Sequence, residues 1–294
     1  GGELARARGE RGHALLHLVA ALEQVAPGGR EEDLAADAVK QPKPQLLLEQ
    51  LQEACDITER GFRRVLEFVK PGVWEYEIEA EFIHEFVRSK SRGFAYGPII
   101  ASGKNACVLH YVDNNRQCKD GDVLLLDVAA EYANYASDLT RSIPVNGKFT
   151  KRQKDVYKSV LKVHREAVKL LKPGQTFEKY NKAVGDMMTE ELLKLNLLTK
   201  EDVKKENPNW PAFKKYFMHG TSHFLGLDVH DVGFFYEPMQ AGMVFTVEPG
   251  IYIPEEGLGI RIENNILITT KGQQDLMKNI PIEPEEIEEL MAGK

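Results

Sequence analysis

Four carboxylates that lie inside or beside strand-like apolar runs constrain this chain more than any other feature. Asp127 and Asp138 belong to the segment GDVLLLDVAAEYANYASDLTR, and Glu248 and Glu263 belong to VFTVEPGIYIPEEGLGIRIENNILIT. Aspartate and glutamate are seldom buried unless they are paired or bind a metal, so exposure on the surface explains four such residues poorly. The two segments therefore predict a polar pocket built on a sheet.

Strand geometry indicates that these carboxylates converge. Side chains alternate between the two faces of a strand, so Asp127 shares a face with Leu125, and Glu263 shares one with Arg261. His219 and His223 are separated by Gly-Thr-Ser, which favours a strand, here expected over about 216–230. Their even spacing then places both imidazoles on one side of that strand.

The residue types at this pocket point to metal binding. Four carboxylates and one imidazole within a few ångströms carry too much negative charge to coexist, and two divalent cations would neutralise it. Ligands rich in oxygen, with one nitrogen and no thiolate, favour Mn²⁺, with Co²⁺, Fe²⁺ or Zn²⁺ as alternatives. Each residue alone could instead be a strand-end acid, a turn cap or a core histidine. Jointly they predict a two-metal site with the ligands Asp127, Asp138, His223, Glu248 and Glu263.

The composition of the chain limits the kinds of molecule that it can be expected to bind. The chain has 294 residues and a formal net charge of -7, which gives no electrostatic case for binding nucleic acid or an anionic membrane surface. No stretch approaches the roughly 20 apolar residues of a membrane span. Three cysteines without a CxxC pair are typical of a reducing compartment, so we expect a cytoplasmic protein.

The chain divides near residue 45. Residues 1–44 are rich in Ala, Gly, Arg and Glu and end in the stiff KQPKPQ linker, which predicts an atypical N-terminal segment and one catalytic domain over 45–294. Within that domain, apolar periodicity predicts helices over about 45–69, 75–90, 155–171 and 177–195. Strands are expected around 94–101, 107–112, 122–145, 243–253 and 260–269.

The domain reads as an internal duplication. The first and third helices both end in Lys-Pro-Gly, at positions 102 residues apart, and the acidic segments recur at an offset of 121 to 125 residues. A period this long indicates two half-domains related by a pseudo-two-fold axis. A metal pair held by matching hairpins would lie on that axis. Lys-Pro-Gly alone is a common helix stop, so the acidic segments carry most of this interpretation.

Five ordered motifs resemble one family. LHYVDNN, LLLDVAAEYANYASDLTR, HGTSHFLGLDVHD, TVEPGIY and GIRIEN resemble the pita-bread metallopeptidases, which include aminopeptidase P, prolidase and, more distantly, methionine aminopeptidase. The resemblance is greatest to aminopeptidase P and covers about residues 45–290. It implies an α+β pita-bread fold, with duplicated half-domains and a curved, mainly antiparallel sheet covered by helices. Close members usually carry a large N-terminal domain, which residues 1–44 do not resemble.

The resemblance also implies roles for individual residues. Asp138 and Glu263 would bridge two metal ions, and Glu248 would be both a ligand and the proton shuttle. His110 would hold the substrate near its proline, and His230 would donate a hydrogen bond to the scissile carbonyl or the tetrahedral intermediate. The substrate pocket would be completed by His219, Tyr252 and Arg261.

The implied activity is hydrolysis of the bond between an N-terminal residue and a following proline, by a water that two metals about 3.5 to 4 Å apart bridge and activate. The expected partners are Xaa-Pro peptides and a second copy of the chain in a homodimer. One alternative is a prolidase limited to Xaa-Pro dipeptides. Another is a pita-bread binding module without catalysis, which the presence of all five ligand positions disfavours.

Overall fold

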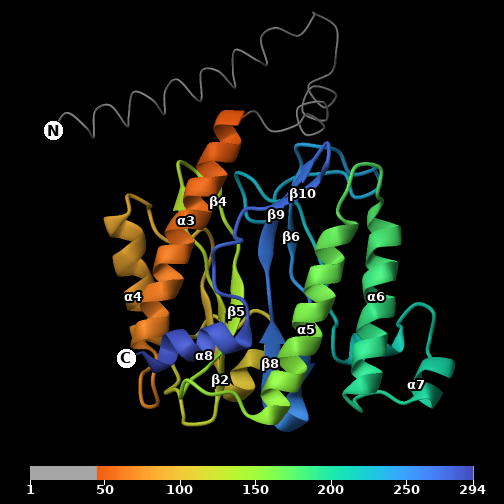
Figure 1. The fold of residues 1–294 in the computed structure, drawn as a ribbon, viewed down its shortest axis with the longest axis horizontal. Helices are drawn as coiled ribbons and strands as arrows, with labels where there is room; N and C mark the ends of the chain where they lie inside the picture. The colour runs from red at the N-terminus through yellow and green to blue at the C-terminus, as the bar shows by residue number, and fades with distance from the viewer. Residues whose placement is uncertain (1–44, 294) are drawn as a thin grey trace, which may run out of the picture. The chain divides into compact units, whose positions relative to one another are not determined.

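In the computed structural model, which describes residues 45–293, two pairs of long helices pack beside four antiparallel strand groups. Figure 1 shows how these elements are arranged. The predicted segment 1–44 lies outside the described residues. In the first half the helices are α3 (Gln45–Phe68) and α4 (Glu75–Arg88), and in the second they are α5 (Lys151–Leu170) and α6 (Phe177–Lys194). These bounds confirm the four helices that periodicity predicts.

Each half also contributes strands in the same order. The first half contains β1 (Ile99–Ser102), β2 (Val123–Asp127), β3 (Glu131–Tyr132), β4 (Tyr135–Ala136) and β5 (Thr140–Pro144). The second contains β6 (Val244–Val247), β7 (Gly250–Ile253), β8 (Leu258–Arg261), β9 (Asn264–Thr269) and β10 (Gly272–Asp275). Short helices η1 (Gly103–Cys107), α7 (Lys200–Lys204), η2 (Ala212–Lys215) and η3 (Pro254–Glu256) lie in the connections, and α8 (Pro284–Ala292) follows β10.

The strand pairing repeats between the halves. β2 pairs with β5 and encloses the β3–β4 hairpin, just as β6 pairs with β9 and encloses the β7–β8 hairpin. Each outer pair gains a third strand, β1 beside β2 and β10 beside β9, and every pair is antiparallel. A bridge between Thr140 and Glu263 joins the first half to the second. The duplication expected from the sequence is therefore present in the topology.

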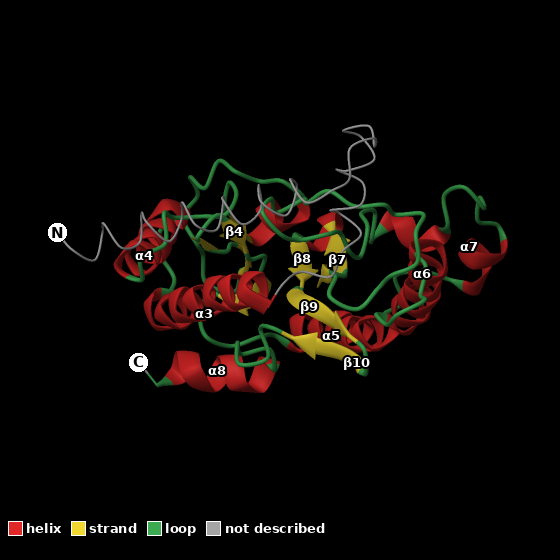
Figure 2. Cartoon of the chain, turned by 90° about the horizontal axis from the view of Figure 1, so that it is seen from above, coloured by secondary structure: helices red, strands yellow, loops and turns green. Residues whose placement is uncertain are grey.

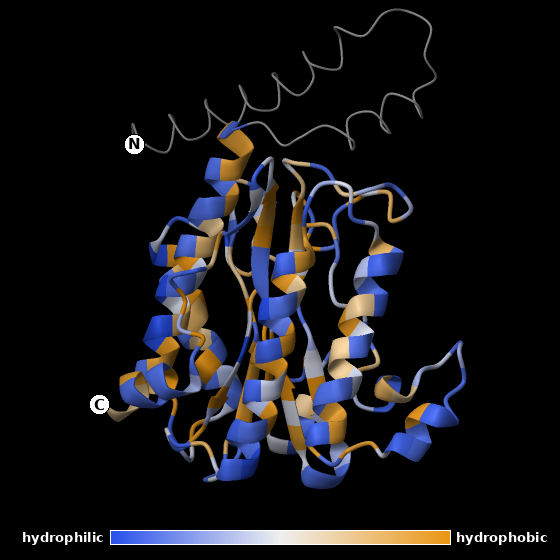
Figure 3. Cartoon of the chain, turned by 45° about the vertical axis from the view of Figure 1, so that its right-hand side comes forward, coloured by the Kyte–Doolittle hydropathy of each residue, from blue (hydrophilic) through white to orange (hydrophobic). Residues whose placement is uncertain are grey.

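The helices bury one face against the strands. α3 packs on α4 and α5 on α6, and in Figure 2 α8 lies on the side of α3 and α5 that is away from β7 and β8. Figure 3 shows orange and blue stripes along the helices, as expected where one face is apolar and the other faces water. α3 and α5 both end before a Pro-Gly turn, in which Gly72 (φ +96°) and Gly174 (φ +83°) adopt the left-handed region that favours glycine.

Two segments differ from the sequence prediction. Residues 107–112 form no strand, because the 3-10 helix η1 runs to Cys107 and an irregular loop follows it. Residues 216–230 form no regular strand either, although 221–225 run antiparallel to β6. There the Glu248 and Thr246 amides donate to the carbonyls of Thr221 and His223. None of the helices in 45–293 is long and apolar enough to cross a bilayer.

His164 on α5 is a buried base with neither ring nitrogen hydrogen-bonded among the described residues. Burial, with help from the nearby Arg141 charge, lowers the pKa of His164 from 6.5 to about 3. As pH falls below 6.5, the unfolded chain therefore takes up a proton that the folded chain does not accept until about pH 3. This difference lowers the free energy of unfolding by about 1.4 kcal/mol per pH unit across that window.

We therefore expect His164→Leu to flatten the dependence of stability on pH. Between pH 6 and pH 4 the variant should lose about 1.4 kcal/mol per pH unit less stability than the parent. Denaturant unfolding at each pH measures the slope, and His84→Leu on the exposed side of α4 is the control. Equal slopes for the parent chain and His164→Leu would contradict the effect.

Candidate metal centre and its cavity

The four carboxylates sit where strands end, in matching places of the two halves. Asp127 is the last residue of β2 and Asp138 follows β4, whereas Glu248 follows β6 and Glu263 lies between β8 and β9. In the antiparallel pairing of β2 with β5, Asp127 lies opposite Thr140. The isolated bridge between Thr140 and Glu263 brings Glu263 to the same place. The ends of strands from both halves thus place these acidic side chains close to one another.

His223 is oriented to offer one nitrogen to these acids. Its Nδ1 lies 2.9 Å from the Phe224 carbonyl, which can only accept, so Nδ1 carries a proton and Nε2 is the nitrogen that faces the acids. Nε2 lies 3.4 Å from Asp138 Oδ2 and 3.7 Å from Glu248 Oε1. A ligating histidine in proteins is commonly fixed in this way by a carbonyl that accepts from its other nitrogen.

Glu263 is the most enclosed of the acids. One oxygen, Oε2, accepts a 2.6 Å hydrogen bond from the Thr140 hydroxyl, and the other, Oε1, has no hydrogen-bond partner in the described part of the chain. A buried carboxylate oxygen without a partner is costly, and a cation is the kind of group that would satisfy it. Asp138, His223 and Glu263 each offer one ligand atom, and these atoms lie within 4.8 Å of one another.

The acids raise one another's pKa. Burial, followed by the charges of Asp138 and Asp127, raises the pKa of Glu248 to about 8 against the opposing effect of His223. Burial and the neighbouring acids also raise the pKa values of Asp127 and Glu263. Although burial works against it, the Asp138 hydrogen bond and the Asp138 and Glu248 charges raise the pKa of His223 to about 9. The site therefore attracts positive charge, which a proton or a metal ion can supply.

Arg261 connects the acids to the pocket wall. Its guanidinium donates to Asp127 Oδ2 at 2.5 Å and to the Tyr252 hydroxyl at 2.8 Å. Tyr252 lies 2.7 Å from His219 Nε2, and His219 Nδ1 lies 2.8 Å from the Gly220 carbonyl. Since that carbonyl only accepts, the Tyr252 hydroxyl donates to Nε2. Burial and the Arg261 charge lower the pKa of His219 to about 3, so this histidine stays neutral.

The acids, Arg261 and the histidines line one cavity of about 420 Å³. Its walls bring together the five predicted ligands and four of the other predicted residues, namely Asp127, Asp138, His223, Glu248, Glu263, His110, His219, His230 and Arg261. Tyr252 lies behind Arg261 and His219. The His230 ring packs edge-on against His223 with centroids 4.4 Å apart, and burial and the His223 charge lower its pKa.

Comparisons with known proteins identify a metallopeptidase family. Residues 49–270 match the model of metallopeptidase family M24. The chain belongs to family M24. An M24 relative, the Xaa-Pro aminopeptidase of Haemophilus influenzae, is 43% identical over 82% of this chain and 58% of the relative. The Escherichia coli Xaa-Pro aminopeptidase is 39% identical over 98% of this chain and 70% of its own length.

Solved M24 structures share the fold. A zinc-substituted E. coli aminopeptidase P in complex with product superposes with a TM-score of 0.83 and 38% identity, over 90% of this chain and 62% of that one. The pita-bread fold expected from the motifs is thus confirmed. The chain spans 58% of the H. influenzae relative and 70% of the E. coli one.

Three residues that hold the predicted ligands in place were not singled out in the sequence. Tyr96 donates to Asp127 Oδ1 at 2.7 Å, and Thr140 donates to Glu263. Asn265 holds the Asp138 backbone at both ends, accepting from its amide at 3.0 Å and donating to its carbonyl at 2.7 Å. Asn265 directly precedes the apolar run Ile-Leu-Ile of β9, a signal that could have identified it, whereas Thr140 precedes the polar residues Arg141 and Ser142 in β5 and does not stand out. Tyr96, in GFAYGP, carries no such signal.

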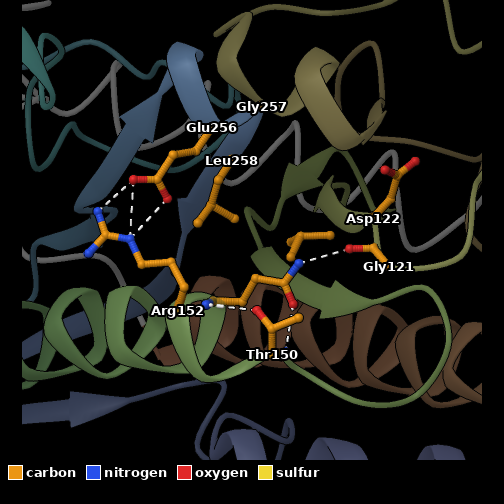
Figure 4. A pocket seen from close by; sticks show the side chains of 9 residues that line it. Gly121, Asp122, Thr150, Arg152, Glu256, Gly257 and Leu258 are labelled. Atoms are coloured by element: carbon orange, nitrogen blue, oxygen red, sulfur yellow. Dashed lines mark hydrogen bonds and ion pairs between the residues drawn. The ribbon is translucent and has the colours of Figure 1, made fainter.

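A second cavity lies at the turn before β2, the start of α5 and the turn before β8 (Figure 4), with a volume of about 190 Å³. Arg152 there donates to both oxygens of Glu256, at 2.7 and 2.9 Å, and Gln153 donates to the Gly121 carbonyl. Because Arg152 and Glu256 neutralise each other, this cavity offers no set of metal ligands comparable with the one that lines the larger cavity.

Proposed function

We propose that this chain is a metal-dependent Xaa-Pro aminopeptidase, which hydrolyses the bond between an N-terminal residue and a following proline. The observation that carries the proposal is the single cavity in which all five predicted ligands meet His110, His219 and His230. The names of the M24 relatives support the substrate class. Because the chain covers just part of their length, the activity of the whole protein is a proposal as well.

The residues present fit divalent metal binding, and we propose two ions with Mn²⁺ as the native metal. The residues that would hold them are Asp127, Asp138, His223, Glu248 and Glu263, with Asp138 and Glu263 contributing to both sites. The unpartnered Glu263 Oε1, the position of His223 Nε2 between two acids and the raised pKa of Glu248 support this assignment, since a metal ion would replace the proton on Nε2. When bound, two such ions lower the pKa of water and stabilise the negative charge that forms on the substrate carbonyl.

The chain's own residues supply the rest of the chemistry. Glu248, whose carboxylate lies 3.7 Å from His223 Nε2, accepts the proton released by the attacking water and passes it to the leaving proline nitrogen. His230, with a lowered pKa, keeps one N–H to donate to the scissile carbonyl oxygen. His110 holds the substrate near its proline, and neutral His219 with Tyr252 and Arg261 fixes the opposite wall.

Proline explains why a dedicated enzyme is needed. A peptide bond to proline is a tertiary amide without an N–H, so peptidases that recognise this donor are poorly placed to bind it. The wall beside His110 includes the apolar side chains of Leu109 and Val112, which can pack against a pyrrolidine ring. This surface supports recognition by shape and apolar contact in place of a hydrogen bond.

The proposed function predicts how many metal ions each chain takes up. We expect the metal-free protein to take up two Mn²⁺ ions per chain, because five ligands with two shared carboxylates serve two centres. Elemental analysis after loading and desalting measures the ratio. A ratio below one ion per chain would contradict the two-metal assignment.

Substrate length decides between the two enzymatic hypotheses. The Mn²⁺-loaded protein is offered an Xaa-Pro-Yaa tripeptide, the matching Xaa-Pro dipeptide and an Xaa-Ala-Yaa tripeptide as control. Release of Xaa from the proline tripeptide supports the aminopeptidase, whereas cleavage of the dipeptide alone indicates the prolidase. Faster cleavage of the alanine control, or no cleavage of any peptide, would overturn the proposal.

Location and assembly are further proposals. The three cysteines are all free, which supports the cytoplasmic location inferred from the sequence. The homodimer is proposed from the family resemblance. Sedimentation of the loaded chain measures its mass in solution.

A further inference from the structure

A fully buried carboxylate lies outside the metal centre. Glu75 is the first residue of α4, and its side chain has no solvent exposure. A buried acid needs a partner, yet the groups hydrogen-bonded to Glu75 are neutral amides and hydroxyls. All of its donors come from one segment, residues 102–116, which leads to the cavity.

The hydrogen bonds of Glu75 span this segment from end to end. Oε1 accepts from the Ser102 amide at 2.8 Å and from the Ser102 hydroxyl at 2.7 Å, with the Asn105 side chain at 3.4 Å. Oε2 accepts from the Tyr111 hydroxyl at 2.8 Å and the Arg116 amide at 2.9 Å. One side chain therefore holds the start, the middle and the end of the loop.

Tyr111 is the link between Glu75 and the cavity. Its ring is buried in a small apolar cluster that also contains Tyr252 and Leu125. The residues on either side of it, His110 and Val112, are exposed and line the cavity. Fixing the Tyr111 hydroxyl therefore fixes the direction in which both neighbours point.

α4 holds the same loop at a second point. Glu79, one turn after Glu75, accepts a 3.0 Å hydrogen bond from the Asn114 side chain. That side chain also donates to the Pro98 carbonyl and accepts from the Ile100 amide, both at 3.0 Å. Two acids on one helix face thus hold the loop on both sides of Val112. The 3-10 helix η1 at the start of the loop is held tightly against β8, since a Cβ on Gly259 would lie 2.1 Å from the Ala106 carbonyl oxygen.

We propose that Glu75 is a positioning residue, which acts through Tyr111 to hold His110 and Val112 in place for the substrate. The kinetic part of this inference rests on the proposed function, whereas the hold on the loop does not. Glu75→Gln keeps the size of the side chain but replaces one acceptor oxygen by a donor, so either the Ser102 amide or the Arg116 amide loses its acceptor and one end of the loop is released. Tyr111→Phe removes only the link to the loop tip.

Hydrogen exchange on the Mn²⁺-loaded full chain tests the hold directly. In Glu75→Gln we expect the amides of residues 108–116 to exchange about tenfold faster or more, with those of α5 unchanged. Tyr111→Phe should accelerate exchange over 109–113 alone. Glu81→Gln, which removes an acid on the same helix that pairs with Arg64, is the matched control and should change neither region. Unchanged exchange at 108–116 in Glu75→Gln would overturn the proposal.

Kinetics test whether the loop acts through His110. Glu75→Gln should raise KM for the Xaa-Pro-Yaa tripeptide and lower kcat/KM by about tenfold to a hundredfold, the scale for a misplaced binding group. Partial unfolding would lower kcat alone. In a His110→Ala background the same change should cost less than about twofold, because the contact it positions is already gone. An equal loss in both backgrounds, or faster exchange without any kinetic change, would refute the positioning role.

The two measurements separate this inference from the proposed function. If the parent chain cleaves no Xaa-Pro peptide, the proposed function fails, and hydrogen exchange still decides whether Glu75 holds the loop. If the parent chain is active and Glu75→Gln has parental exchange and kinetics, the inference fails by itself. Metal content, measured for every variant, should stay at the parental value.

Discussion

Glu248→Gln is expected to lower kcat for Xaa-Pro-Yaa by at least about a hundredfold while the fold and its thermal midpoint are retained. The amide keeps the shape of the side chain but loses both its charge and its capacity to accept a proton. Glu248 lies 3.7 Å from His223 Nε2 and 3.6 Å from His219 Nδ1, so it faces the reaction centre.

Glu255→Gln is the matched control, because Glu255 is an exposed acid in η3. It should leave kcat and KM at parental values. Steady-state rates with tripeptide, together with the metal content of each variant, make the comparison. Activity of Glu248→Gln within about tenfold of the parent would remove Glu248 from the proton-transfer role.

Replacing His223 by alanine is expected to cause loss of metal and loss of turnover together. His223 offers the one nitrogen among the proposed ligands, and its Nε2 lies 3.4 Å from Asp138 Oδ2. Without it the remaining ligands are carboxylates, which hold Mn²⁺ less selectively. Elemental analysis should therefore return less metal per chain than in the parent, and kcat/KM should fall below detection.

His230→Ala gives the contrasting result, since its ring packs against His223 from the cavity side. Metal content should match the parent, while kcat/KM should fall by about a hundredfold, the scale for losing one oxyanion donor. His110→Ala should behave in the same way. Loss of metal in either variant would make that residue a ligand, and parental kinetics in both would reduce these histidines to structural residues.

Local patterns predicted the helices and the positions of the acids well. α3 and α5 follow from apolar periodicity and the Lys-Pro-Gly stops, because both signals lie within the helix itself. Asp127 and Glu263 could be singled out because an acid inside an apolar run is unusual wherever the chain folds. Both signals can be read from the sequence without knowing which strands become neighbours.

What the sequence could not supply depends on distant partners. Tyr96 reaches Asp127 from 31 positions away, and Asn265 holds the Asp138 backbone from 127 positions away. The segment 216–230 was expected to form a strand, but it is irregular outside 221–225, since the hydrogen bonds to β6 continue only from Thr221 to Leu225. Glu75 resembles an ordinary acidic residue in the first turn of a helix, and only the path of the loop shows that it is buried.

The bridge between Thr140 and Glu263 joins the two repeats at the metal centre, so metal binding affects how strongly the repeats are held together. Asp138 comes from one repeat, and His223 and Glu263 come from the other. Any ion held by these three residues is therefore a cross-link between the repeats, and its binding free energy adds to the free energy that keeps them together. A chelator would then act as a mild denaturant of this interface. If the chain is cleaved in the turn at Gly147, between β5 and α5, its two fragments should associate more strongly when metal is bound than when it is absent.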